Sequence, residues 1–150
     1  GFNEPGASPL SRTRLVRLDP VSRRDNASSF HGEENVPTHA VTMGIATILE
    51  CRKIVLMAFG EHKSAIIRTA LEEPASEACP ASFLQNHPQA VFVIDEPAAT
   101  ELTTVTTPWV TGIVDWTPEL IRRAVLWLSV QASKGLLKLT SDDFRAHNLH

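Results

Sequence analysis

The sequence is poor in the features that mark secreted, metal-binding and membrane proteins. It has 150 residues, no tyrosine and only two cysteines, Cys51 and Cys79, which lack a second cysteine or a histidine at metal-ligand spacing. We therefore expect reduced thiols in a cytoplasmic protein, with neither a disulfide nor a metal site. The longest apolar run, Ile54 to Phe59, is far too short to span a bilayer, so no membrane segment is predicted.

An excess of positive charge is also missing. The 14 Lys and Arg residues face 17 Asp and Glu residues, which gives a formal net charge of −3 at pH 7, and no basic cluster stands out. Proteins bind nucleic acids largely by neutralising phosphates with clustered Lys and Arg side chains, so that function is not expected. The length suits one ordinary domain, which could bury about two-thirds of its unfolded surface.

The sequence does contain two segments that predict buried strands, the apolar run at residues 54–59 and A-V-F-V-I-D at residues 90–95, with helical periodicity between them at residues 64–72. Apolar runs of this length are typical of parallel strands that are covered on both faces. Strand, helix and strand at this spacing predict a right-handed βαβ crossover. The predicted fold class is therefore α/β, with a mostly parallel sheet and flanking helices.

The remaining segments are predicted from local patterns. Alternating polar and apolar residues from Arg12 to Leu18 predict a strand, whereas apolar residues recur at helical spacing from Thr38 to Glu50. Residues 19–35 are polar and suit a surface loop or lid with one helical turn. Further helices are predicted at residues 80–86, 97–102, 117–133 (ended by Gly135) and from Ser141, with residues 103–116 irregular.

Chemistry is expected at one edge of the sheet. Ligands of parallel α/β sheets bind beyond the carboxyl ends of the strands, which places residues 19–35, 60–63 and 95–97 on the candidate face. Lys63 precedes a helix N-terminus and suits a phosphate, although most lysines at such positions are simply solvated. His39 and His62 lack a neighbouring nucleophile and are expected to be structural or solvated, with His62 also a candidate for substrate contact.

Two blocks of the sequence resemble one known family. They are F-N-E-P-G at Phe2 to Gly6 and V-P-T-H-A-V-T-M-G-I-A-T-I-L at Val36 to Leu49. Together they are similar to the glucosamine-6-phosphate deaminase family, also called glucosamine/galactosamine-6-phosphate isomerases, and the similarity continues to about Leu102. In that family the first block ends a longer motif, D-G-H-[IV]-[AG]-F-N-E-P. The resemblance implies a Rossmann-like sugar-phosphate isomerase fold, with residues 1–150 as the C-terminal portion of one such domain and its N-terminal part missing.

The resemblance also implies an activity, that of an isomerase and hydrolase of amino sugar metabolism in N-acetylglucosamine catabolism. Glucosamine 6-phosphate would become fructose 6-phosphate and ammonia by ring opening, enolamine formation and hydrolysis, without a metal or an organic cofactor. The family's catalytic His, general-base Asp and phosphate loop have no match in the chain, so we expect the chain alone to be inactive. The tail beyond Thr103 resembles a variant branch in which the domain is longer or joined to a deacetylase-like domain.

Individual roles carry over where the motifs match. Glu4 matches the carboxylate that tunes the charge of the catalytic His, and it is the catalytic residue implied in this chain. Lys63 matches the G-x-x-K lysine that contacts the sugar phosphate. Asn3 and His62 are further candidates on the substrate face.

The chain departs from the family at the second phosphate-binding residue. An Arg is expected near Ser28 or Ser29, and the nearest arginines are Arg23 and Arg24. Either of these replaces the missing Arg from a shifted loop, or phosphate is held more weakly, or the substrate differs. D-E-P at Asp95 to Pro97 also matches the family, and we interpret it as the end of a strand and the cap of a helix.

A second departure concerns activation by N-acetylglucosamine 6-phosphate in allosteric bacterial members. Arg14 matches one residue that helps to bind this activator, but Ala7 and Val16 stand where Ser and Lys are expected. We therefore expect no such activation, and Arg12 and Arg14 as solvent-facing strand residues. The three tryptophans, Trp109, Trp116 and Trp127, are expected to be core or interface anchors.

The sequence leaves two other functions open. One is a non-catalytic sugar-phosphate-binding or regulatory module on the same fold, and the other is a 6-phosphogluconolactonase, which the two matching blocks fit less well. The exact amino sugar and the oligomeric state, including a homo-oligomer, are also left open. Because the first strands of the sheet are expected to be missing, we predict an exposed apolar face and poor solubility or association of the isolated chain.

Overall fold

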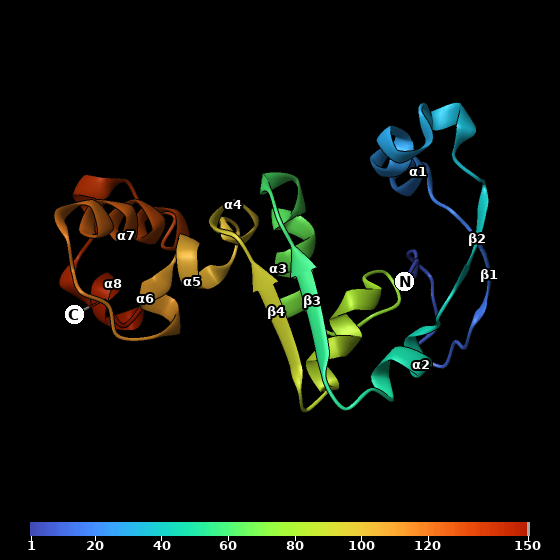
Figure 1. Cartoon of the computed structure of the whole chain (residues 1–150). Coiled ribbons are helices and arrows are strands. Elements are labelled where there is room, and N and C mark those ends of the chain that lie inside the picture. The colour runs from blue at the N-terminus through green and yellow to red at the C-terminus, as the bar shows by residue number, and fades with distance from the viewer. Residues whose placement is uncertain (150) are drawn as a thin grey trace. The chain divides into compact units, whose positions relative to one another are not determined.

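The computed structural model describes residues 1–149 as an α/β chain that divides into two compact units, residues 1–99 and residues from 100 onward (Figure 1). Strands occur in the first unit only, among the described residues, as one parallel and one antiparallel pair. The α/β class is confirmed. The predicted parallel pairing is confirmed for β3 (Ile54–Ala58) with β4 (Ala90–Ile94), whereas β1 (Arg14–Arg17) and β2 (His39–Thr42) pair antiparallel.

The parallel pair forms the centre of the first unit. Strands β3 (Ile54–Ala58) and β4 (Ala90–Ile94) pair in register, with Ile54 opposite Ala90 and Ala58 opposite Ile94. The chain between them forms η3 (Glu61–Lys63), α3 (Ser64–Glu72) and η4 (Pro80–Asn86). This is the predicted strand, helix and strand, with each boundary within a residue or two of its prediction.

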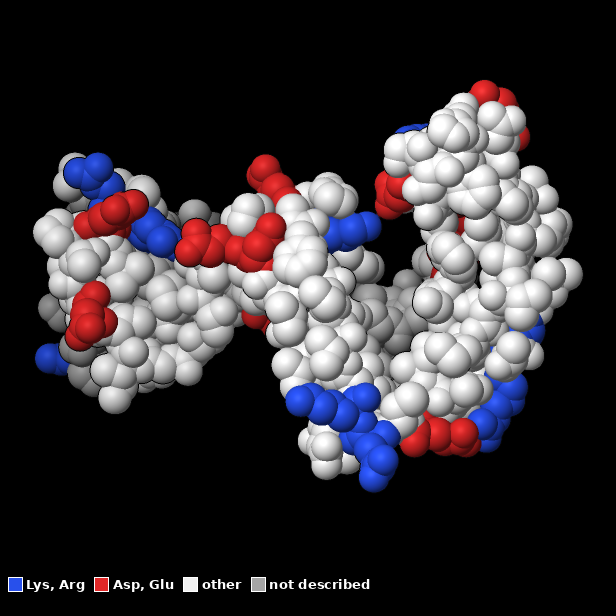
Figure 2. All heavy atoms as spheres, viewed as in Figure 1, with Lys and Arg blue, Asp and Glu red and all other residues white. Residues whose placement is uncertain are grey.

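One face of this pair is exposed, although the sequence predicts cover on both faces. The exposed fractions of Val55, Met57, Val91 and Val93 are 52%, 64%, 44% and 40%. Val55 lies opposite Val91 and Met57 lies opposite Val93, so these side chains form one continuous apolar face. Figure 2 shows no charged side chains over the middle of these strands on the face in view. The apolar composition of both faces is thus present, but the described residues cover only one of them.

We expect this face to make the isolated chain associate, because burying apolar surface is favourable by about 25 cal/mol per Å². Replacing Met57, which is 64% exposed, by Lys should shift the chain toward monomer in sedimentation velocity. Leu137→Lys is the matched control, since Leu137 is fully exposed in the second unit and gains the same charge. A sharp, reversible, monomeric melting transition of the unsubstituted chain would contradict this prediction.

The antiparallel pair corrects one helix prediction. Strand β1 (Arg14–Arg17) is confirmed, and it pairs with β2 (His39–Thr42), which the sequence predicts as the start of a helix. The helix α2 is limited to Ile45–Leu49. Cross-strand pairing to β1 outweighs the helical spacing of Val41 and Ile45. Gly44 separates the two elements, and a side chain there would collide with the carbonyl oxygen of Ser11.

The segment between β1 and β2 is more helical than predicted. It contains α1 (Pro20–Asn26), η1 (Ala27–Phe30) and η2 (Glu33–Asn35) in place of a loop with one helical turn. Asp19 caps α1 by accepting a hydrogen bond from the Val21 N–H at 2.8 Å, and Pro20 occupies its first turn. None of the α1 residues is buried. This segment, residues 19–35, is called the lid segment below.

The first unit ends with the short helix α4 (Glu96–Ala99), and the second unit is helical. It contains α5 (Thr103–Thr106), α6 (Pro108–Thr111), α7 (Pro118–Gln131), η5 (Leu136–Lys138) and α8 (Ser141–Ala146). The prediction of an irregular segment at residues 103–116 is wrong where α5 and α6 lie, whereas residues 112–116 form neither helix nor strand, as predicted. The helix α7 begins as predicted, with the Thr117 hydroxyl accepting from Leu120 N–H, but it ends at Gln131, before Gly135.

The core of the second unit is built around Leu128, which has no exposed surface, together with Trp109, Ala124 and Leu149. The Trp109 ring lies 6.3 Å from that of Trp116 in a stacked arrangement and 5.9 Å from that of Trp127 in an edge arrangement. Such ring contacts stabilise a core beyond the area that they bury. Trp109 and Trp127 are therefore packing residues, as the sequence predicts, whereas Trp116 stacks on Trp109 but is 44% exposed.

The last helix, α8, begins with a capping box formed by Thr140 and Asp143. Hydrogen bonds from Lys134 and Thr140 lower the pKa of Asp143 from 3.8 to about 2. A carboxylate with a lowered pKa stabilises the fold above its unfolded pKa and loses that effect as the pH falls through the folded one. We expect the melting temperature of the second unit to fall between about pH 4 and pH 2, and Asp143→Asn to reduce this pH dependence in calorimetry. An unchanged pH dependence in that variant would contradict the assignment.

Candidate functional site

Glu4 is fixed by the lid segment. Its Oε1 accepts hydrogen bonds from the Ser22 hydroxyl at 2.7 Å and from the Asp19 N–H at 3.4 Å. Ser22 lies in α1, and Asp19 is the residue that caps that helix. The half-buried carboxylate is thus held by neutral donors, and Glu4 lines the neighbouring hollow.

A hollow of about 340 Å³ lies beside Glu4. Its lining has two carboxylates and two guanidinium groups among the following residues: Glu4, Pro5, Arg17, Leu18, Asp19, Pro20, Arg23 and Thr38. The Arg23 Nη2 donates to the carbonyl oxygen of Glu33 at 2.9 Å, while its buried Nε has no hydrogen-bond partner within residues 1–149. Arg24 is exposed and does not line the hollow. Of the two candidate arginines, Arg23 is therefore the one beside Glu4.

Asn3 has a structural attachment on each side. Its amide Nδ2 donates to the carbonyl oxygen of Met43 at 3.0 Å, and its Oδ1 accepts from Arg14 Nη1 at 3.2 Å. Arg14 is half-buried, so the prediction that it faces solvent is wrong, because it reaches back to Asn3. Arg12 is exposed as predicted, and its hydrogen bond with Glu50 at 2.6 Å lowers the pKa of that carboxyl group.

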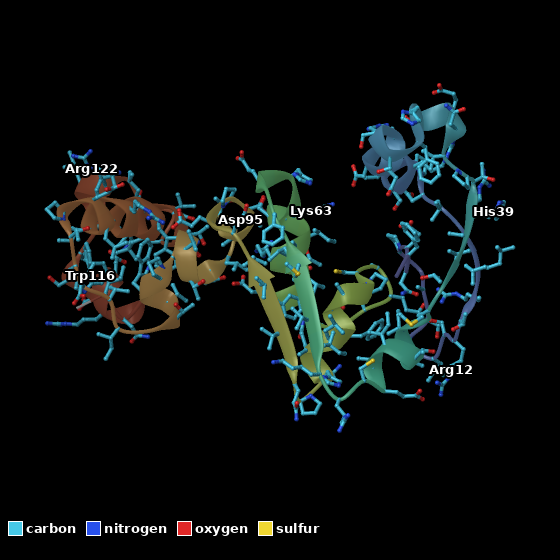
Figure 3. The ribbon with its side chains drawn as sticks, in the orientation of Figure 1. Arg12, His39, Lys63, Asp95, Trp116 and Arg122 are labelled. Atoms are coloured by element: carbon cyan, nitrogen blue, oxygen red, sulfur yellow. The ribbon has the colours of Figure 1, made fainter. Side chains whose placement is uncertain are left out.

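Lys63 lies past the C-terminal end of β3, and Asp95 lies at the end of β4 (Figure 3). The Asp95 carboxylate accepts from the Gly60 N–H at 2.9 Å and from the Ala98 N–H at 3.0 Å. It caps α4 and joins the ends of the two strands, which confirms the interpretation of D-E-P as the end of a strand and a helix cap. Gly60 has a φ of 89°, which favours glycine, and this turn sets the direction of Lys63.

The two candidate histidines, His39 and His62, lie in different parts of the first unit. A side chain on Gly60 would lie 3.0 Å from the His62 ring, so His62 packs over the turn that precedes Lys63. His39 is exposed in β2 and its Nδ1 lies 2.9 Å from the Thr38 hydroxyl. His39 is thus a strand surface residue, whereas His62 stays on the edge of the sheet that carries Lys63.

The lid segment connects Lys63 to Glu4. The Lys63 Nζ lies 3.6 Å from Asp25 Oδ2, and Ser22 hydrogen-bonds Glu4. Ser22 and Asp25 are three residues apart in α1, so their side chains share one face of the helix at a Cβ separation of roughly 5–6 Å. Glu4 and Lys63, far apart in the chain, thus both contact one face of α1.

Sequence reasoning missed Ser22 and Asp25. A usable signal was present, since Asp19-Pro20 is a helix start that would have placed both residues on one helical face. Within residues 1–149, no group of His, Cys, Asp and Glu side chains is arranged to hold a metal ion. The described helices include none that is long and apolar enough to cross a membrane. Cys51 and Cys79 are both free thiols, and burial raises the pKa of Cys79.

Comparison with known proteins relates the chain to one group. It is 42% identical over 148 residues to a protein of Bacteroides thetaiotaomicron named glucosamine-6-phosphate deaminase-like, covering 99% of the chain and 22% of that protein. It is 52% identical over 102 residues to a glucosamine-6-phosphate deaminase of Rhodopirellula baltica, covering 68% of the chain and 41% of that enzyme. No family model matches the chain.

A solved structure gives the same relation for the fold. It is a monomeric glucosamine-6-phosphate deaminase of the NagB superfamily, with a TM-score of 0.64 and 43% identity over 66% of this chain and 41% of that one. The chain thus spans less than half the length of the relatives that it matches. The shorter matches, of 102 residues to the R. baltica enzyme for example, are about as long as the first unit, which ends at Ala99.

Proposed function

In sequence and fold this chain belongs with the glucosamine-6-phosphate deaminases, and we propose on that basis that it serves an amino-sugar phosphate isomerase-deaminase. The reaction is glucosamine 6-phosphate plus water to fructose 6-phosphate plus ammonia. The observation that supports the proposal is that Glu4 and Lys63 each contact a side chain of α1, Ser22 and Asp25 respectively, and that Lys63 follows the C-terminal end of β3.

The proposed roles of the site residues follow from the charges of their side chains. A carboxylate at Glu4 favours the imidazolium form of a histidine that would open the sugar ring, as a neighbouring negative charge does. Lys63 supplies a positive charge for the phosphate, and Arg23 supplies a second one from the hollow beside Glu4. Asn3 attaches the Glu4 loop to Met43 and to Arg14 of β1. We propose that His62, whose ring lies against Gly60 in the turn before Lys63, contacts the sugar.

Proton transfer and binding need no metal or organic cofactor in this scheme. A base takes the C2 proton of the opened amino sugar to give an enolamine and delivers a proton to C1, which leaves an imine at C2. Water then adds to C2, and the imine nitrogen leaves as ammonia to give the ketone. Positioned acids and bases supply the acceleration. Neither that base nor the ring-opening histidine has a counterpart here, so we propose that the 150-residue chain alone is inactive.

The test has two arms. The DNA upstream of the Gly1 codon is sequenced, and the chain and its in-frame extension are assayed for ammonia and fructose 6-phosphate from glucosamine 6-phosphate. We expect D-G-H-[IV] upstream, activity in the extended protein and none in the chain. An intact D-G-H motif without ammonia release would overturn the proposal.

A non-catalytic sugar-phosphate-binding module is the second candidate. The observation that favours it is the absence of an Arg at Ser28 and Ser29, which are exposed in the lid segment. Binding of fructose 6-phosphate without turnover in the extended protein would support it. We further propose that the enzyme is cytoplasmic, that it forms a homo-oligomer, and that the second unit leads to a deacetylase-like domain.

A further inference from the structure

The cation proposed for the phosphate already faces an anion of the same chain. The Lys63 Nζ lies 3.6 Å from Asp25 Oδ2, and the exposed fractions of the two side chains are 37% and 50%. Lys63 comes from the turn after β3, whereas Asp25 comes from α1 in the lid segment. The pair therefore joins two parts of the first unit at the edge where ligand binding is expected.

A carboxylate and a phosphate monoester present the same chemistry to an ammonium group, namely anionic oxygens that accept charge-assisted hydrogen bonds. A phosphate next to an aspartate is repelled, because both are negative. Resting on the proposed role of Lys63, we propose that Asp25 competes with the phosphate of the ligand for Lys63 and so sets how tightly the site binds phosphate monoesters.

Competition for Lys63 also affects the helix that contacts Glu4. The helix α1 has no fully buried residue, and its polar contacts include those of Ser22 with Glu4 and of Asp25 with Lys63. A phosphate that takes Lys63 removes one of these two contacts. Phosphate binding at Lys63 thereby removes one contact of the helix whose Ser22 holds the catalytic carboxylate.

The test measures phosphate binding by the 150-residue chain, with Met57→Lys in every protein to limit association. Inorganic phosphate and fructose 6-phosphate are titrated separately, with fructose as the unphosphorylated control, and the amide signals of residues 60–65 are followed by ¹H–¹⁵N NMR. The variants are Asp25→Asn, Lys63→Met and Asp142→Asn. The last is a matched control, because Asp142 pairs with Arg145 at 3.5 Å in another exposed ion pair and its loss changes the net charge equally.

We expect Asp25→Asn to lower the Kd for both phosphates about two- to fivefold, the range of an exposed ion pair, and Asp142→Asn to leave it unchanged. Added salt should shrink the difference, because exposed charges are screened. If Asp25→Asn and Asp142→Asn bind phosphate with equal affinity and Lys63→Met does not bind it, the proposed role of Asp25 is overturned and that of Lys63 stands. Phosphate binding that survives Lys63→Met would instead overturn the proposed role of Lys63, and no binding by Asp25→Asn would also overturn the inference.

Discussion

Replacing Glu4 by Gln should lower kcat for ammonia release by about 10²- to 10⁴-fold in the extended protein that shows activity. The side chain keeps its size and can still accept from the Ser22 hydroxyl, which lies 2.7 Å from Oε1 in the structure. What the substitution removes is the negative charge that favours an imidazolium beside it. The loss should therefore appear in kcat, while KM changes little, because the phosphate contact at Lys63 is untouched.

The pH profile separates this role from a structural one. Without the Glu4 charge, the ring-opening histidine of the extended protein should lose its proton at lower pH. The pH range over which this histidine is an imidazolium, and over which kcat is high, should therefore end at lower pH. Glu77→Gln is a suitable control, because the Glu77 side chain is exposed. The backbone carbonyl of residue 77, which accepts a hydrogen bond from the Gly6 N–H, is retained in this variant. A Glu4→Gln enzyme with unchanged kcat, or with a change in KM alone, would contradict the catalytic assignment.

The parts of the fold that could be predicted are those in which local pattern and tertiary role agree. Residues 54–59 and 90–94 are apolar throughout, and both segments form strands of the parallel pair. Thr117-Pro118 is a helix start with the capping hydroxyl in place, and α7 begins there. The apolar face over Val55 and Val91 also follows from these runs, since parallel strands are built to be covered on both sides.

The prediction failed where a distant partner decides the local structure. Residues 39–42 satisfy helical spacing, yet they pair with β1, and no local signal reveals that partner. Arg14 likewise turns inward because Asn3 is there to accept its hydrogen bond. Glu4 and Lys63 were found through motifs, but the contact of Asp25 with Lys63 depends on the path of the lid segment. The competing anion is therefore a product of the fold that spacing alone does not reveal.

Leu128→Ala should unfold much of the second unit at 25 °C. Leu128 has no exposed surface and lies in the cluster with Trp109, Ala124 and Leu149. Removing a fully buried leucine costs about 2–5 kcal/mol, which includes the cavity left behind. A unit of roughly 50 residues has a free energy of unfolding of only about 2.5–7.5 kcal/mol, at 0.05–0.15 kcal/mol per residue. The expected cost is therefore comparable to the whole stability of the unit.

Tryptophan fluorescence measures this effect without interference from the first unit, because Trp109, Trp116 and Trp127 are the three tryptophans of the chain and all lie in the second unit. In urea titrations followed by fluorescence, Leu128→Ala should show a greatly lowered midpoint or an emission maximum already shifted to the red without denaturant. Leu137→Ala removes the same atoms from a fully exposed site and should leave the midpoint within experimental error. Equal midpoints for the two variants would mean that the Trp109 cluster is not the core that holds the second unit together.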